Sequence, residues 1–136
     1  ILSKFDDRTS IILLAVLMSG NPSIQLPLTP AAFHILVSLT DGAMHGYAIK
    51  RVVEERTEGV VRLGAGTLYH AIRSLHKRGL VDETDSPQLY EAGSSRWRFY
   101  CITKEGQRVL EAELRRLEAD VQHAKAKLAL ARQEPS

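Results

Sequence analysis

Apolar and polar positions alternate with helical spacing most clearly between Gly64 and Val81. Leu68, Ile72 and Leu75 lie at i, i+4 and i+7, so they share one face of a helix. Polar and basic side chains repeat the same spacing on the opposite face: His70, Arg73, Ser74 and Lys77. The pattern predicts a helix that packs one face into a core and presents the other, and Gly79 follows it as the expected C′ residue.

Two earlier segments also carry helix signals. Thr29 and Pro30 combine an N-cap with a proline at N1, which predicts a helix through about Leu39. A turn at 41–42 separates it from a second helix over about Gly46 to Arg56. The candidate core residues of these two helices are Phe33, Leu36, Val37, Leu39, Tyr47, Ile49, Val52 and Val53.

The chain opens with a segment that is apolar on nearly every side. Asp6 or Asp7 caps a predicted helix that ends near Ser19, before the breaker sequence 20–22. Its apolar run, residues 11–18, is much shorter than the ~20 residues that span a bilayer, and no cleavage site of the A-x-A kind follows it. We expect this helix to pack against a partner's C-terminal helix, and the native start of the chain stays open because it begins with Ile1.

After Gly79 the periodicity changes from helical to alternating. Residues Leu80–Thr84 and Arg96–Ile102 predict two strands joined by a polar loop. In the second strand Trp97, Phe99 and Cys101 form an apolar face, and the opposite face holds Arg96, Arg98 and Tyr100. The pattern predicts a β-hairpin with a basic tip.

Residues 104–136 show a third pattern. Thr103 caps a long helix whose apolar positions alternate by four and three over three heptads. Such a narrow stripe favours packing against another helix, although it could also fold back on its own domain. The predicted dimer interface consists of Leu110, Leu114, Leu117, Val121, Ala124 and Leu128.

Composition limits the size of the core and locates the charge. A chain of 136 residues, 44% hydrophobic and 25% charged, forms one small domain with extensions. Residues 59–81 contain four cations and no carboxylate, and so carry a net charge of +4. Because the whole chain has a net charge of +2, the remaining residues carry −2. Positive charge is therefore concentrated on the presented helix, as in nucleic-acid-binding proteins. The single Cys101 indicates a reducing compartment, and hence the cytoplasm.

Enzyme and metal signatures are weak. Residues 64–66 lack the lysine and spacing of a phosphate-binding loop, and neither a nucleophile elbow nor an acid/base pair is visible. The five histidines show no ligand spacing with cysteine or carboxylate partners. We therefore expect a protein that is not an enzyme, with no catalytic residue, cofactor or metal.

The order of elements predicts a winged helix-turn-helix followed by a dimerisation helix, a mainly α fold with a small β-hairpin. A helix fits the major groove of B-DNA while a hairpin beside it contacts the backbone. Arg73 and His70 are the candidates for base edges, with Ser74 on the same face and Tyr69 at its flank. The candidates for phosphate contacts are Lys77, Arg96, Arg98 and Thr67, the last together with backbone amides at the helix N-terminus.

Three sequence blocks resemble a known family. His45-Gly46-Tyr47, the run GTLYHAIRSLHKRGLV from Gly66, and RFYCITKEG from Arg98 look like the signature blocks of the PadR family of transcriptional regulators. The resemblance implies a homodimeric repressor with a winged-helix DNA-binding domain, often released by a small-molecule or stress signal. It carries over Tyr69, Arg73 and Lys77 on the recognition helix and Arg98 in the wing. Ala65 departs from the proline common at that position.

These observations predict three parts: an apolar helix and linker that pack in the dimer (1–28), a DNA-binding domain (29–103) and a C-terminal dimerisation helix (104–136). The expected partners are double-stranded DNA carrying an inverted repeat, a second copy of the chain, and an effector whose identity stays open, as do the operator and the regulated genes. The alternatives are a solvated helix surface and a winged-helix module that dimerises and binds protein without DNA.

Overall fold

The structure is a computed structural model, and it describes residues 25–84 and 98–133. Within these ranges the elements follow the order α2 (Pro30–Leu39), β1 (Met44–His45), α3 (Gly46–Arg56), α4 (Ala65–Lys77), β2 (Val81–Thr84), β3 (Phe99–Ile102) and α5 (Lys104–Gln133). The predicted N-terminal apolar helix, Arg96 and Trp97 lie outside the described residues. The mainly helical fold with a small sheet and a long C-terminal helix is confirmed.

Local hydrogen bonds explain where the helices begin and end. Thr29 Oγ1 accepts from the Ala32 amide at 3.1 Å, and Pro30 occupies the first helical position of α2. His45 Nδ1 accepts from the Ala48 amide at 3.2 Å and caps α3. Gly79 has φ 78°, and this left-handed residue ends α4 as expected.

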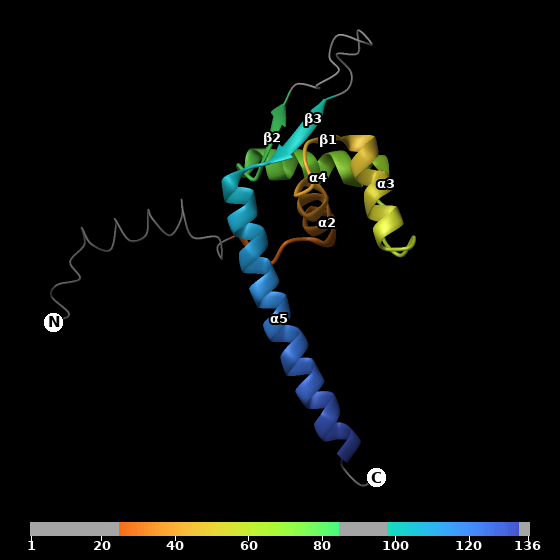
Figure 1. The fold of residues 1–136 in the computed structure, drawn as a ribbon, viewed down its shortest axis with the longest axis vertical. Helices are drawn as coiled ribbons and strands as arrows, with labels where there is room; N and C mark the ends of the chain where they lie inside the picture. Colours follow the sequence, from red (N-terminus) through yellow and green to blue (C-terminus); the bar gives the residue numbers. More distant parts are fainter. Residues whose placement is uncertain (1–24, 85–97, 134–136) are drawn as a thin grey trace, which may run out of the picture.

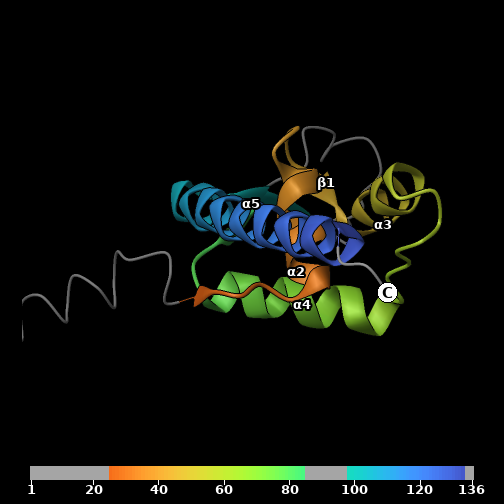
Figure 2. The same cartoon turned by 90° about the horizontal axis from the view of Figure 1, so that it is seen from below.

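The helices pack in layers around α2. Figures 1 and 2 show α2 between α4 and α5, with α3 beside it and α5 extending far beyond the rest. The strands form an antiparallel sheet in the order β1-β3-β2. The sequence did not predict β1, because two residues are too short to show an alternating pattern.

The core lies where α2, α3, α4 and the start of α5 meet the sheet. Its fully buried side chains include Ile35, Leu36, Leu39, Ile49, Val53, Ile72, Leu75, Leu80, Val81 and Val109. Phe33, Val37 and Val52 are half-buried. The prediction for Tyr47 was wrong, since it is 59% exposed. Helical geometry points it away from the side that buries Ile49 and Val53, and its ring stacks on His45.

The two faces of β3 also differ from expectation. Tyr100, predicted on the polar face, is buried, while Phe99 and Cys101, predicted on the apolar face, are half-buried. The reason is that the face of Tyr100 turns toward α4, so that Tyr100 and Ile72 line the same groove. The face of this strand that lies toward α4 is therefore the one that carries Arg98 and Tyr100.

A buried carboxylate ties the start of α5 to the segment before α2. Glu113 is 2% exposed, and its Oε2 accepts from the Leu28 amide at 2.8 Å. Arg116 donates to both carboxylate oxygens and also to Asp120 at 3.1 Å. The hydrogen bonds of Arg116 chiefly hold the pKa of Glu113 below its ordinary value, and the Leu28 amide adds to this against the opposing effect of burial.

Candidate nucleic-acid interface

Helix α4 presents the polar face that its sequence predicts. Leu68, Ile72 and Leu75 are buried, whereas Arg73 and Lys77 are exposed. Gly64 is the N-cap and gives no side-chain hydrogen bond, and the first turn contains no acidic residue. The amides at this end are thus oriented favourably for an anion. Ala65 stands at N1, and the helix begins there without a proline.

The presented face of α4 divides into two grooves. Tyr69 and Arg73 line a groove against β2 and β3, which we name the α4–wing groove. Thr67, His70 and Ser74 line a groove on the other side, against the start of α2, which we name the α2–α4 groove. The tertiary structure therefore separates residues that a helical projection places on one face, and Lys77 lines neither groove.

The α4–wing groove gathers three of the predicted DNA contacts. Tyr69 and Arg73 come from α4, and Arg98 reaches the groove from the residue before β3. Its volume is about 500 Å³, and His76 and Tyr100 complete the lining with Ile72 and Glu83. Burial mainly raises the pKa of Tyr100, and Glu83 adds to this effect.

Sequence reasoning missed Glu83. Its Oε1 lies 3.2 Å from Arg98 Nη1, and the side chains of Glu83 and Arg98 are 45% and 66% exposed. The register explains the pairing, because Glu83 is opposite Tyr100, and Arg98 lies two residues before Tyr100 on the same side of the strand. The hairpin register was the signal that could have revealed it. The cation predicted to contact phosphate thus already has an acidic neighbour.

Tyr69 packs against Gly46, which belongs to another sequence block. A Cβ built on Gly46 would lie 2.5 Å from the Tyr69 hydroxyl oxygen, closer than real side chains allow. The absence of a side chain at Gly46 therefore lets Tyr69 pack against the start of α3. This contact is a physical reason for the two sequence blocks, His45-Gly46-Tyr47 and Gly66–Val81, to occur together.

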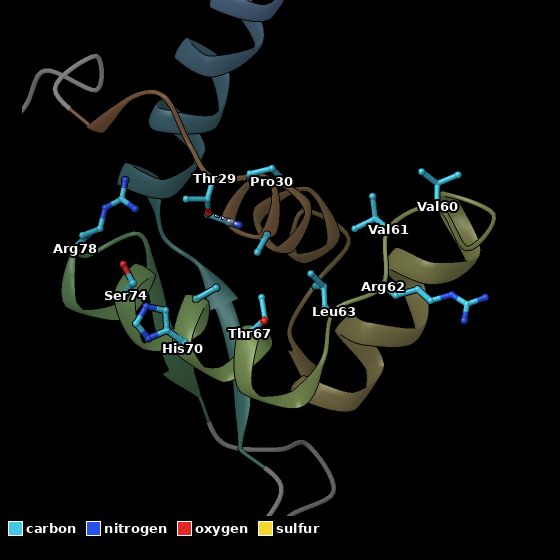
Figure 3. A pocket seen from close by; sticks show the side chains of 13 residues that line it. Thr29, Pro30, Val60, Val61, Arg62, Leu63, Thr67, His70, Ser74 and Arg78 are labelled. Atoms are coloured by element: carbon cyan, nitrogen blue, oxygen red, sulfur yellow. Dashed lines mark hydrogen bonds between the residues drawn. The ribbon is translucent and has the colours of Figure 1, made fainter.

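The α2–α4 groove has a different character. Its volume is about 570 Å³, and Figure 3 shows Thr67, His70 and Ser74 along one wall with Thr29 and Pro30 opposite. Arg78, at one end, donates from Nε to Gln25 Oε1 and from Nη2 to the Gln25 carbonyl, both at 3.0 Å. Burial lowers the pKa of Arg78. The groove combines a mostly apolar lining with a cation at its edge.

The predicted interface on α5 spans two environments. Leu110 is 6% exposed and belongs to the core of its own chain. Leu117 is half-buried, whereas Leu114, Val121, Ala124 and Leu128 are exposed. From Leu114 onward the stripe residues are therefore exposed, apart from the half-buried Leu117.

Residues 25–84 and 98–133 hold neither a metal-binding cluster nor a membrane-spanning helix. This part of the chain contains no group of three His, Cys, Asp or Glu residues placed to hold a metal ion. Within the same part, no helix is long and apolar enough to cross a bilayer.

Comparison with known proteins agrees with this geometry. Residues 35–112 match the model of the transcriptional regulator PadR-like family. The chain is 39% identical over 79 residues to an uncharacterized 37.1 kDa protein in transposon TN4556 of Streptomyces fradiae, and it spans only 20% of that relative's length.

Solved structures share the fold. A transcriptional regulator from Clostridium thermocellum aligns with a TM-score of 0.61 at 22% identity, covering 71% of this chain and 87% of the other. A PadR family transcription regulator from Clostridium difficile aligns with a TM-score of 0.59 at 22% identity, covering 74% and 99%.

A small sheet packed beside a helix with one presented face, joined to a long C-terminal helix, defines a winged helix-turn-helix protein. Because the family model covers more than half of its residues, the chain belongs to the PadR-like family of transcriptional regulators.

Proposed function

We propose that this protein is a sequence-specific DNA-binding regulator that inserts α4 into the major groove. The observation that supports this most directly is the α4–wing groove, where Tyr69 and Arg73 of α4 lie beside Arg98 of the wing. A base-reading helix and a backbone-contacting hairpin need this arrangement, because they must reach the same stretch of duplex together.

Each predicted residue has a role in this proposal. Arg73 and His70 contact base edges, and Tyr69 contacts the backbone or a thymine methyl group. Ser74 faces DNA from the same wall of the α2–α4 groove as His70. Lys77, Arg98 and Thr67 contact phosphates, as does Arg96, which lies outside the described residues. Arg98 exchanges Glu83 for a phosphate when DNA binds.

We further propose that the protein acts as a homodimer through the exposed stripe of α5. Two-fold symmetry would place two α4 helices in successive major grooves roughly 34–36 Å apart, so the operator is an inverted repeat. Residues 29–103 then form the DNA-binding domain and 104–136 the dimerisation helix, with 1–28 packing in the dimer. The protein represses transcription in the cytoplasm by excluding polymerase, and an effector releases it.

The competing function is a winged-helix module that dimerises and binds protein without contacting DNA. Such a module has no need for cations on α4 and the wing together. The acid-free stretch from Gly59 to Val81 therefore favours DNA over a protein partner.

The salt dependence of duplex binding separates these two functions. We expect the affinity for duplex DNA to fall with a slope of about −0.9 in log–log form for each phosphate contact, because bound counterions are released. Fluorescence anisotropy across a salt series measures this slope. Lys77→Ala should make it shallower by about one contact, and a protein that ignores every duplex at low ionic strength would contradict the proposal.

Arg73→Ala tests base reading. The variant should lose about 1–3 kcal/mol of binding free energy and relax the preference at one base pair, because a bidentate contact to guanine is lost. Selection of duplexes from a random pool, sequenced for both proteins, measures the preference. Lys77→Ala is the matched control and should weaken all sequences alike; an unchanged preference in Arg73→Ala would remove the base-reading role.

A further inference from the structure

The α2–α4 groove has a more aliphatic lining than the α4–wing groove. Pro30, Val61, Leu63 and Ala71 line it with aliphatic surface. Phosphates need several cations or amide donors nearby. Arg62 does not supply one, since its side chain points away from the groove in Figure 3 and donates to the Gly59 carbonyl at 3.3 Å. The walls instead favour an apolar molecule.

The groove is elongated and has unlike ends. Figure 3 shows Arg78 at one end and Val60 with Val61 at the other. Among the described residues, the Arg78 guanidinium donates to neutral groups of Gln25 and pairs with no carboxylate. Two of its five N–H donors are used in these bonds. A partly desolvated cation at one end of an apolar trough is complementary to a carboxylate with an apolar tail.

The lining also indicates the shape of the tail. No Phe, Tyr or Trp from the described residues lines the groove, so the His70 imidazole is the one ring from those residues on which an aromatic ligand could stack. Side chains of alanine, valine, leucine and proline contact an aliphatic chain equally well along its length. The volume of about 570 Å³ accommodates a molecule of this kind.

We propose that the α2–α4 groove binds an aliphatic monocarboxylate, with the carboxylate at Arg78 and the chain toward Val60, and that this ligand excludes DNA from α4. The exclusion rests on the proposed function, in which Thr67, His70 and Ser74 face DNA. Those three side chains form one wall of the groove, so an occupied groove covers them. The groove thereby supplies a place for the effector of the proposed regulator.

The first experiment measures ligand binding to the full chain without DNA. Octanoate, hexanoate and 1-octanol are titrated while amide chemical shifts are followed by NMR. We expect shifts confined to residues 29–32, 60–63 and 67–78, with octanoate about fifteenfold tighter than hexanoate, because each of its two extra buried methylenes contributes about fourfold. Octanol should bind at least tenfold more weakly than octanoate, since it lacks the charge. Equal affinities for octanoate and octanol, or shifts confined to α5, would overturn the proposal.

Variants test the contact at Arg78. Arg78→Gln should weaken octanoate about tenfold and remove its advantage over octanol, whereas Arg51→Gln, an exposed arginine on α3 paired with Glu55, should change neither. Val60 is 85% exposed, so replacing it leaves the fold intact. Val60→Glu should weaken octanoate more than Val60→Gln does, through charge repulsion. Wild-type affinity in both Arg78→Gln and Val60→Glu would refute the site.

The second experiment measures competition with DNA. Octanoate should displace a labelled duplex from the wild-type protein, and its apparent affinity should fall as the duplex concentration rises. Octanoate binding without displacement would overturn the exclusion while leaving the proposed DNA binding intact. Octanoate binding by a protein that ignores every duplex would instead overturn the proposed function and leave the ligand site standing.

Discussion

The two halves of α5 share one heptad pattern and differ in what surrounds them. The first half, through Arg116, buries Val109 and Leu110 in the core, and its Glu113 bonds to the segment before α2. In the second half every residue from Glu118 to Gln133 is exposed, although Val121 and Leu128 continue the same stripe. A single sequence pattern therefore serves two purposes, folding of one chain and, in our proposal, association of two.

Truncation of the buried part should have the largest effect. Leu110→Ala is expected to lower the free energy of unfolding by about 2–5 kcal/mol, because it leaves a cavity in the core. Urea unfolding at several protein concentrations measures this loss, which should not depend on concentration.

The matched variant is Leu128→Ala, which removes the same side chain from the exposed half. The loss of unfolding free energy in Leu128→Ala should change with protein concentration, because stability gained through association follows mass action. An equal, concentration-independent loss in both variants would show that the second half of α5 belongs to the fold of the single chain.

A charge at the half-buried Leu117 of the stripe should have the next largest effect. Leu117→Glu is expected to weaken association about a hundredfold, close to 3 kcal/mol, because it places a carboxylate between apolar surfaces. Sedimentation velocity measures the change, and duplex affinity should fall with it.

Leu130 offers the control, since it is 59% exposed, much like Leu128, but lies off the stripe. Leu130→Glu should sediment as the wild type does. If Leu117→Glu also remains a dimer, the association surface lies elsewhere.

The smallest effect is expected at the link between α5 and the segment before α2. Glu113→Gln should cost about 1–3 kcal/mol of stability at neutral pH, because a buried charge-assisted hydrogen bond is weakened. Thermal unfolding measures this loss, and Glu118→Gln, on the exposed half, should be neutral.

The pH dependence of stability provides a second test of the role of Glu113. The folded pKa of Glu113 lies below its ordinary value of 4.5, so its contribution is complete above that value and disappears as pH falls through the folded pKa. Stability of the wild type should therefore drop more steeply than that of Glu113→Gln below about pH 4.5. Parallel curves would contradict the assigned role.

Much of the fold could be predicted because its signals are local. Thr29, Pro30 and Gly79 set helix ends through their own hydrogen bonds and backbone preferences, and the structure confirms all three. The apolar stripe of α4 was equally reliable, since a helix repeats its faces within a few residues. For α3 the predicted boundaries are confirmed, but the prediction that Tyr47 is buried was wrong. The apolar residues around Tyr47 in the sequence do not show which face of the helix meets the core.

The candidate site was less predictable, because it depends on which elements meet. The residues of α4 were identified, but their division between two grooves follows from the positions of α2 and the sheet. Glu83 and Glu113 were missed for the same reason, as each acts through a partner distant in sequence.

The sequence by itself determined the helices, their caps, the presented face of α4 and the heptad stripe of α5, because each is written in spacings of a few residues. Only the tertiary structure decided that Tyr100 faces inward, that Tyr69 rests against Gly46 and that Leu110 is buried while Leu128 is exposed. The physical reason is that burial and pairing depend on the surfaces that meet in three dimensions, and a periodic pattern cannot specify which surface that is.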